Sequence, residues 1–161
     1  MGGYPRPKSA NAPSIIVIIA ILTVAAITVY MIAPRMLLSV KVYADQTLTV
    51  EKGVFSNVST LVETGKTLEV AVDVSSGGAV DVFLMNSEDK INWDKYVEGQ
   101  LQSFTYISQG SALKTKLFRY TFIVPQQDTY FVIVSNQGGI PGGAIPTGDV
   151  VAHVKILARA G

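Results

Sequence analysis

The residues of this chain that are best suited to chemistry are one histidine and a group of acidic side chains. His153 is the single histidine of the sequence, and no Ser or Cys nucleophile motif stands with it. Cysteine is absent, so thiol nucleophiles, disulfides and the usual zinc ligand sets are excluded. We therefore predict a protein that is not an enzyme, with no catalytic residue, cofactor or metal, and we interpret His153 as an ordinary surface side chain.

The acidic side chains gather in one stretch of the sequence. They are Asp81, Glu88, Asp89, Asp94 and Glu98. Carboxylate oxygens are the ligands that Ca²⁺ prefers, so a calcium-binding loop is one interpretation of this group. Their spacing matches no EF-hand, however, and Lys90 and Lys95 are interleaved with them. We therefore favour a solvated polar loop and keep calcium binding as the alternative hypothesis.

Aromatic side chains stand in or just after the same polar stretch and suggest a surface for contact with another protein. They are Trp93, Tyr96, Phe104 and Tyr106. Large rings are enriched at protein interfaces, but they also bury readily in cores. We expect burial of at least one or two of the four, and we name Trp93 and Tyr96 as candidates for partner binding.

A second candidate contact region is the segment Gln137 to Gly148, which has five glycines and two prolines and is called the Gly/Pro loop below. It is not a phosphate-binding loop, because it lacks the GxxxxGKS/T motif and no helical pattern follows it. Connecting loops of β-sandwiches often carry function, so we predict that Ile140, Pro141 and Ile145 contact a partner. A flexible turn region is the alternative, and on either hypothesis we expect the loop to be dispensable for folding.

These candidate residues must be positioned by two very different parts of the chain, of which the first is an apolar run. Ile15 to Ala33 contains no charged residue. As a helix rising ~1.5 Å per residue it would span roughly 28 Å, close to the ~30 Å hydrocarbon core of a bilayer. Pro13 and Pro34 suit the two helix ends. We predict an uncleaved transmembrane helix over residues 13–34, with a cleaved signal peptide and a buried core helix as the alternatives.

The flanks of this run indicate its orientation. The tail, residues 1–12, is rich in Gly and Pro and carries Arg6 and Lys8, and we expect it to be disordered. The positive-inside bias predicts a cytoplasmic N-terminus, one crossing of the cell membrane and a C-terminal domain outside. Asn57-Val58-Ser59 is the one N-glycosylation sequon, which makes Asn57 a candidate glycosylation site.

The second part of the chain, residues 36–161, is long enough for one compact domain. It holds ten Lys and Arg residues against twelve Asp and Glu residues, a net charge of −2. A nucleic-acid surface needs a basic stripe, which this balance does not favour. We therefore predict the membrane lipid bilayer and a protein as partners, and no nucleic acid.

Apolar residues alternate with period two through this domain, which predicts strands rather than helices. After a first run at residues 38–43, the expected strands are Thr47–Val50, Val54–Val62, Thr67–Val74, Ala79–Met85, Leu101–Ile107, Lys116–Val124, Tyr130–Asn136 and Asp149–Ala158. Asn86 to Gln100 is interpreted as a polar connector with room for a helical turn. About eight strands separated by turn signals predict an all-β fold, an antiparallel β-sandwich or jelly roll.

The clearest strand pair is Thr67–Val74 with Ala79–Met85, and we predict that it forms a hairpin around Gly77. Its inward faces would carry Val72 and Val82. The inward face expected for the strand at 116–124 consists of Phe118, Tyr120, Phe122 and Val124. The strand at 130–136 is apolar on both faces, so we expect it in the centre of a sheet.

The order of these elements resembles a known class of domain. A strand VDVFLMN and a polar connector with Trp93 precede FRYTFIVPQQDTYFVIVSN, in which two strands flank a proline turn; a closing strand VVAHVKI follows the Gly/Pro loop. Over about Val58 to Leu157 this is similar to GOLD-like (emp24/p24) domains and to pre-peptidase C-terminal domains. The resemblance implies a non-catalytic β-sandwich used for binding or positioning. In p24 proteins the membrane helix follows the sandwich and a coiled coil, so their cargo transport is not carried over.

Together these observations predict a single-pass membrane-anchored β-sandwich that binds another protein, in the cell envelope or as an accessory subunit of a membrane complex. The alternative is a structural component of an archaeal-type filament or of its stator, because pilin-like and archaellum-associated proteins also join an N-terminal apolar helix to a β-domain. The tail lacks the basic-Gly processing site and the helix lacks the early glutamate of bacterial pilins, which disfavours a true pilin. An enzyme ranks third.

Overall fold

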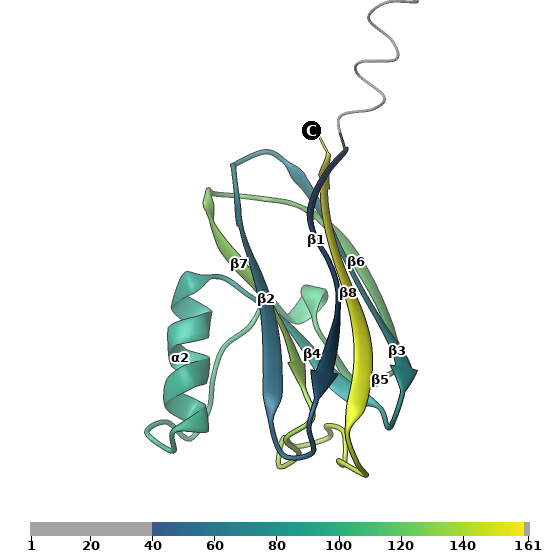
Figure 1. Cartoon of the computed structure of the whole chain (residues 1–161). Helices are drawn as coiled ribbons and strands as arrows, with labels where there is room; N and C mark the ends of the chain where they lie inside the picture. Colours follow the sequence, from purple (N-terminus) through teal and green to yellow (C-terminus); the bar gives the residue numbers. More distant parts are fainter. Residues whose placement is uncertain (1–39, 160–161) are drawn as a thin grey trace, which may run out of the picture. The chain divides into compact units, whose positions relative to one another are not determined.

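The computed structural model describes residues 40–159, which fold into two β-sheets packed face to face (Figure 1). The strands are β1 (Val40–Val50), β2 (Phe55–Val62), β3 (Thr67–Ser76), β4 (Val80–Met85), β5 (Ala112–Thr115), β6 (Leu117–Ile123), β7 (Asp128–Ser135) and β8 (Val150–Arg159). A helix, α2 (Ser87–Val97), and a 3-10 turn, η1 (Ser108–Gly110), lie between β4 and β5 in the chain. All strand pairs among these residues are antiparallel, so the predicted β-sandwich is confirmed for this part of the chain.

The two sheets have the same number of strands and a non-sequential order. The first sheet runs β1-β8-β3-β6 and the second runs β2-β7-β4-β5. Consecutive strands therefore form the edges on each side of the sandwich, β1 with β2 and β5 with β6. The strand predicted to be central, now β7, lies between β2 and β4 as expected.

β3 and β4 do not form the hairpin that the sequence pattern predicts. β3 pairs with β6 and β8 in the first sheet, whereas β4 pairs with β5 and β7 in the second. The chain changes sheets at Gly77, which has a φ of +92° and where an added Cβ would lie 2.4 Å from the Asp149 carbonyl oxygen. Period-two alternation specifies which face a strand buries; because both sheets bury their faces in one core, it does not specify the pairing partner.

The space between the sheets, the sandwich core, is filled mainly by valines. Val72 of β3 and Val82 of β4 are 1% and 0% exposed and both belong to it, so their predicted inward orientation is confirmed although they lie in opposite sheets. One face of β8 is also buried in this core, and comprises Val150, Ala152, Val154 and Ile156. Full burial of one such aliphatic side chain contributes about 1.5–3 kcal/mol, which makes this core the main source of folding free energy.

Three predicted segments differ from the structure. The runs at 38–43 and Thr47–Val50 belong, from Val40 onward, to the single strand β1. Leu101–Ile107 is not a strand, and its rings at Phe104 and Tyr106 pack 5.3 and 5.0 Å from Phe83 on the outer side of the second sheet. The edge next to β4 is formed instead by β5, which is not among the strands expected from the sequence.

The polar stretch that was interpreted as a connector forms a helix of 11 residues, α2. Asn86 caps it, since its side-chain oxygen accepts a hydrogen bond of 2.8 Å from the Asp89 N–H. Glu88 and Asp89 lie in the first turn and Lys95 in the last, which suits the helix dipole at both ends. An asparagine followed by two acidic residues is the signal by which this helix could have been predicted.

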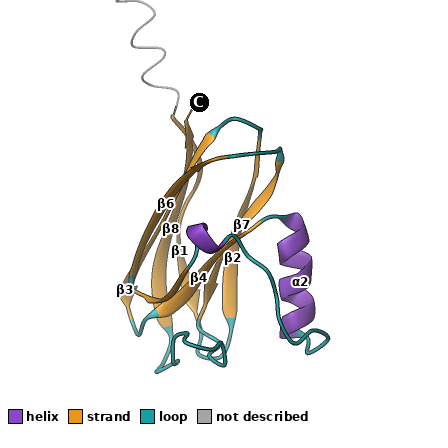
Figure 2. Ribbon diagram, turned by 180° about the vertical axis from the view of Figure 1, so that it is seen from behind, coloured by secondary structure: helices purple, strands orange, loops and turns teal. Residues whose placement is uncertain are grey.

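α2 packs on the outer face of the second sheet, against β4 and β7 (Figure 2). Residues of these strands that point away from the sandwich core are buried beneath it. With the one buried residue of the helix they form a second apolar group, the satellite cluster, which consists of Phe83, Met85, Trp93 and Ile133. All six residues of β4 are consequently buried, because both faces of the strand are covered.

Within residues 40–159, no helix has both the length and the apolar character needed to cross a bilayer. The predicted tail (residues 1–12) and transmembrane helix (residues 13–34) lie outside the described residues. Both stay predictions from the sequence.

Candidate binding cleft beside strand β6

The side of the sandwich formed by β5 and β6 is incompletely closed. β5 pairs with β4 at Val80 and Val82 only. Beyond these residues the edge of β4 is met by the η1 segment, where the Ile107 N–H donates to the Leu84 carbonyl (2.9 Å) and the Leu84 N–H donates to the Ser111 hydroxyl (3.0 Å). The inner side chains of β6 therefore face a short turn instead of a full strand, and a cleft opens there.

Three aromatic rings line this cleft, which has a volume of about 470 Å³. Phe122 stacks on Tyr120 with a centroid distance of 5.6 Å and an interplanar angle of 20°, and it meets Tyr130 of β7 edge-on at 5.5 Å and 65°. Phe118, on the same face of β6, is 8% exposed, whereas Tyr120 and Phe122 are only half-buried. Ligand pockets commonly occupy ~300–1,000 Å³, so the cleft is large enough to bind a ligand group.

The polar lining of the cleft consists of amides and phenols. The amide side chains are those of Asn86, Gln109 and Gln126. The Tyr120 hydroxyl donates to Gln109 Oε1 (3.3 Å), and the Tyr130 hydroxyl donates to the backbone carbonyl of Gln126 (3.2 Å). Burial, with the nearby Asp128 carboxylate, raises the pKa of Tyr130, so its phenol stays a neutral donor at physiological pH.

The remaining lining is apolar, from Ile107, Ile123 and Pro125, so among residues 40–159 no charged side chain lines the cleft. Burying a charge next to such a surface is costly, whereas amides and phenols can hydrogen-bond neutral polar groups. The cleft is therefore suited to a neutral, partly apolar ligand group, such as uncharged side chains with their backbone amides.

The acidic and histidine side chains singled out in the sequence lie elsewhere. His153 is on the outer face of β8, with its Nε2 2.7 Å from Asp45 of β1. Asp94 forms an ion pair of 2.6 Å with Lys90, and Asp89 accepts a hydrogen bond from the Thr105 hydroxyl. In the part of the chain that the structure describes, no three His, Asp or Glu side chains gather as a metal-ligand set.

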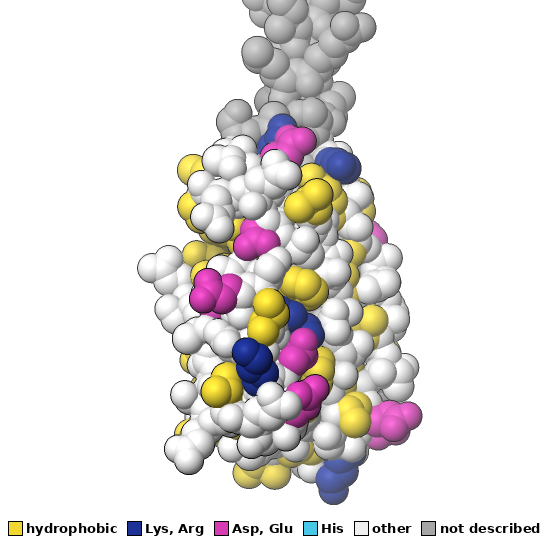
Figure 3. Space-filling view, turned by 90° about the vertical axis from the view of Figure 1, so that its left-hand side faces the viewer, with side chains coloured by type: hydrophobic (Ala, Val, Ile, Leu, Met, Phe, Trp, Pro, Cys, Tyr) yellow, Lys and Arg dark blue, Asp and Glu magenta, His cyan; other side chains and the backbone are white. Residues whose placement is uncertain are grey.

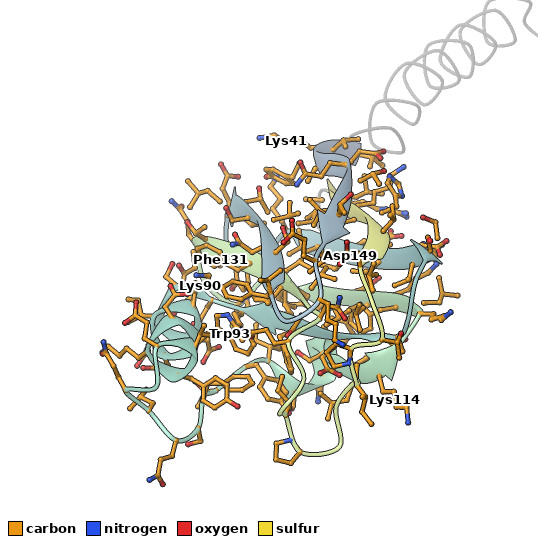
Figure 4. All side chains as sticks on the ribbon, turned by 60° about the horizontal axis from the view of Figure 1, so that its bottom comes forward. Lys41, Lys90, Trp93, Lys114, Phe131 and Asp149 are labelled. Carbon is orange, nitrogen blue, oxygen red and sulfur yellow. The ribbon has the colours of Figure 1, made fainter. Side chains whose placement is uncertain are left out.

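Trp93, a predicted contact residue, lies in the satellite cluster with no exposed surface. Its ring lies 5.4 Å from those of Phe55 and Phe83 and 4.6 Å from that of Phe104, and Figure 4 shows it between the helix and the second sheet. The partly buried side chains of Tyr96 and Ile140 pack against the same cluster. In this structure these three residues hold α2 and the Gly/Pro loop on the sheet.

The Gly/Pro loop has an exposed part and an anchored part. Pro141 and Ile145 are exposed, the latter at 77%, and their contact with a partner stays a prediction. The N–H of Ala144, however, donates to the buried Asp81 carboxylate at 2.8 Å. Shortening the loop would remove this donor, so the structure does not support the expectation that the whole loop is dispensable for folding.

Asn57, the predicted glycosylation site, lies on edge strand β2 with an exposed side chain. The side of the molecule that carries α2 shows charges of both signs interspersed with small apolar areas (Figure 3). Acceptor asparagines must be accessible, and Asn57 meets that condition; its modification stays a prediction.

Sequence reasoning placed Tyr120 and Phe122 in the core and did not find the cleft. Their alternation with exposed residues indicates an inward face, but it carries no information on what lies opposite. The sequence did contain one signal for the cleft. Few residues separate the turn at Gly110 from the strand that begins at Leu117, so only a short strand, β5, fits between them.

No family model matches the sequence, and no curated protein matches it. Among solved structures, the periplasmic inhibitor of g-type lysozyme PliG from Aeromonas hydrophila is similar at 11% identity over 72% of this chain and 85% of that one, with a TM-score of 0.45. A pre-peptidase C-terminal domain of collagenase from Bacillus anthracis is similar at 14% identity over 70% and 88%, with a TM-score of 0.37. Similarity at this level does not indicate what this chain binds.

Proposed function

We propose that this chain is a single-pass membrane protein whose β-sandwich, outside the cytoplasm, is a non-catalytic module that binds a partner protein through the cleft beside β6. The observation that carries the proposal is the cleft itself: aromatic rings and neutral amides exposed where a sandwich would normally be closed. The apolar run from Ile15 to Ala33 supports the anchor, and the basic residues of the tail support its orientation.

Site-specific photo-crosslinking in membranes of cells that express the full chain tests this function. With p-benzoylphenylalanine in place of Gln126, at the cleft, we expect a discrete crosslinked product of the chain with another protein. The same probe in place of Thr49, an exposed residue of β1 on the other side of the sandwich, should give none. The chain should also stay in the pellet after carbonate extraction.

A matched pair of variants shows whether the crosslink depends on the chemistry of the cleft. Gln109→Arg brings a charge to the neutral cleft and should reduce the Gln126 crosslink at least several-fold. Gln46→Arg, the same change at an exposed position of β1, should leave it intact. Equal crosslinking in both variants would contradict the proposal, and a ladder of the chain with itself would indicate a filament subunit instead.

A further inference from the structure

β6 is an edge of the first sheet within residues 40–159, and part of its backbone faces outward. The Val124 N–H donates to the Lys66 carbonyl (2.9 Å), and the Val74 N–H donates to the Lys116 carbonyl (2.8 Å). Because paired and unpaired positions alternate in an antiparallel ladder, even-numbered residues of β6 bond to β3 and odd-numbered residues point away. The outward-facing N–H and C=O groups past Leu117 belong to Arg119, Thr121 and Ile123.

This edge lacks the interruption found in β1, the other edge of the same sheet. β1 has a register shift between Val42 and Ala44, and such bulges protect an edge from pairing with another strand. β6 pairs with β3 without any shift from Leu117 to Ile123. The Leu117 backbone is closed off by the Thr115 hydroxyl, which bonds its N–H and C=O at 3.2 and 2.8 Å; the described residues offer no such partner to the groups beyond it.

The free edge and the cleft adjoin each other, since Tyr120, Phe122 and Ile123 line the cleft. A strand paired with β6 would send alternate side chains to the same side as Tyr120 and Phe122. These side chains would enter a neutral aromatic space, which favours small or apolar uncharged residues.

Basic side chains surround the N-terminal end of this edge. Lys114, Lys116 and Arg119 are exposed and take part in none of the ion pairs formed among the described residues. Arg119 lies across from Ala71 of β3, which Glu69 and Asp73 flank on the same face; Glu69 already pairs with Arg159 at 2.9 Å. Figure 4 shows Lys114 on the side of the domain away from α2. This local positive charge, in a domain of net charge −2, complements an acidic segment.

From the free backbone groups, the neutral cleft and the basic flank together, we infer that the partner contributes an extended segment that adds to β6 as a further antiparallel strand. The segment places two uncharged side chains in the cleft and an acidic side chain opposite Arg119. This inference rests on the function proposed above. Addition of a strand to an exposed edge is a general mode of peptide recognition, in which main-chain hydrogen bonds supply affinity and alternate side chains supply specificity.

The peptide acetyl-TVTVEVD-amide, labelled with fluorescein, tests the inference directly. In antiparallel register its residues lie opposite Ile123 to Leu117 in turn, so that the second and fourth residues, both valine, face the cleft and the glutamate faces Arg119. We expect saturable binding to the full chain in mild detergent, measured by fluorescence anisotropy. Replacing the glutamate by lysine should weaken binding several-fold, and Arg119→Glu should reverse that preference.

N-methylation separates strand addition from side-chain binding. A methyl group on the third amide, opposite Thr121, blocks an N–H that faces β6 and should weaken binding at least tenfold. A methyl group on the fourth amide, whose N–H faces away, should have a much smaller effect. In the protein, Thr121→Pro removes an outward N–H without breaking a bond to β3 and should abolish binding, whereas Thr121→Val should preserve it.

The outcomes distinguish this inference from the proposed function. If both N-methyl peptides bind equally, or no peptide binds while the Gln126 crosslink persists, strand addition is wrong and the module binds differently. If maltotetraose competes for the cleft, or sedimentation shows that a second copy of the chain occupies β6, the inference is also overturned. Should Thr121→Pro fail to fold, judged by its circular dichroism, the N-methyl pair and the Arg119 charge reversal still decide.

Discussion

The sandwich core is filled mainly by valines from both sheets, whereas the satellite cluster beneath α2 combines the aromatic rings of Phe83 and Trp93 with Met85 and Ile133. Every described strand contributes to the sandwich core, β5 through the partly buried Ala112. The satellite cluster depends on one helix, in which Trp93 is the single buried residue. Full burial can therefore come from contacts spread over many strands or from contacts concentrated on one side chain. Only the satellite cluster, which has contacts of the second kind, can be disrupted by truncating one residue while the sandwich core stays intact.

The largest expected effect comes from a charge in the sandwich core. Val82 has no exposed surface, so Val82→Asp would bury a carboxylate without a partner and cost several kcal/mol, against a domain stability of ~5–15 kcal/mol. We expect loss of the cooperative thermal transition, followed by circular dichroism. Leu61→Asp, the same kind of change at a position that is 59% exposed, should melt normally. An unchanged melt of Val82→Asp would show that the strand faces are assigned wrongly.

Truncation of the satellite cluster tests the contrast from the other side. Trp93→Ala removes the ring that attaches α2 and should cost about 3–5 kcal/mol. Because the sandwich core does not include this ring, we expect amide exchange to rise in α2 while strands β3 and β8 stay protected. Ile91→Ala, on the exposed side of the helix, is the control. Equal loss of protection in all strands would mean that the two regions form one cooperative unit.

A third, smaller effect concerns a polar link at the end of the sandwich. The Asn136 side-chain NH₂ donates to the carbonyls of Val50 and Glu51 (3.2 Å each) and of Gly148 (2.9 Å). Asn136→Ala leaves these carbonyls without their donor and should cost about 1–3 kcal/mol in chemical denaturation. Asn57→Ala, at an exposed asparagine, should cost little. A cost for Asn136→Ala no larger than that of Asn57→Ala would show that valine packing alone closes this end.

The smallest effect is expected on the outer face of the first sheet, which no described helix covers. The hydrogen bond from His153, and then that from Lys155, lowers the pKa of Asp45 below its ordinary value. A carboxylate with a lowered folded-state pKa contributes stability that is complete above about pH 4 and is lost as the pH falls through the lowered pKa. Asp45→Asn should therefore melt slightly below the unchanged protein at pH 6, and this difference should shrink as the pH falls below about 4. A difference that grows on acidification would contradict this assignment.

The sequence predicted the buried faces of the strands, but it did not predict which strands pair. Alternation in β3 and β4 correctly indicated the faces that carry Val72 and Val82, because burial against any opposing sheet demands it. The pairing of β3 with β8 could not be predicted, since it depends on segments far apart in the sequence. The function of Asn136, which ends the predicted strand, is visible only once Val50 and Gly148 are brought next to it.

The candidate site was less predictable than the fold. Its residues Tyr120 and Phe122 have the same alternating pattern as true core residues such as Phe118. What exposes them is the shortness of β5 on the opposite sheet, a property of the assembled sandwich. Because the cleft results from the shortness of β5, it leaves no motif in the sequence of β6, the strand that lines it.

The pairing of Val40 with Arg159 has a mechanical consequence for a domain held at its N-terminal end. These residues lie side by side at one end of the β1–β8 pair, while Val50 pairs with Val150 at the far end, next to Gly77. Figure 1 shows β1 and β8 running side by side along the sandwich. Tension between Val40 and that far end runs along β1, nearly perpendicular to its hydrogen bonds with β8, so those bonds share the load in shear and must fail together. Tension between Val40 and Arg159 would instead open the bonds one after another, as in a zipper. The domain should therefore resist a high force when it is pulled between Val40 and the far end of the sandwich. It should open at a low force when Val40 and Arg159 are pulled apart.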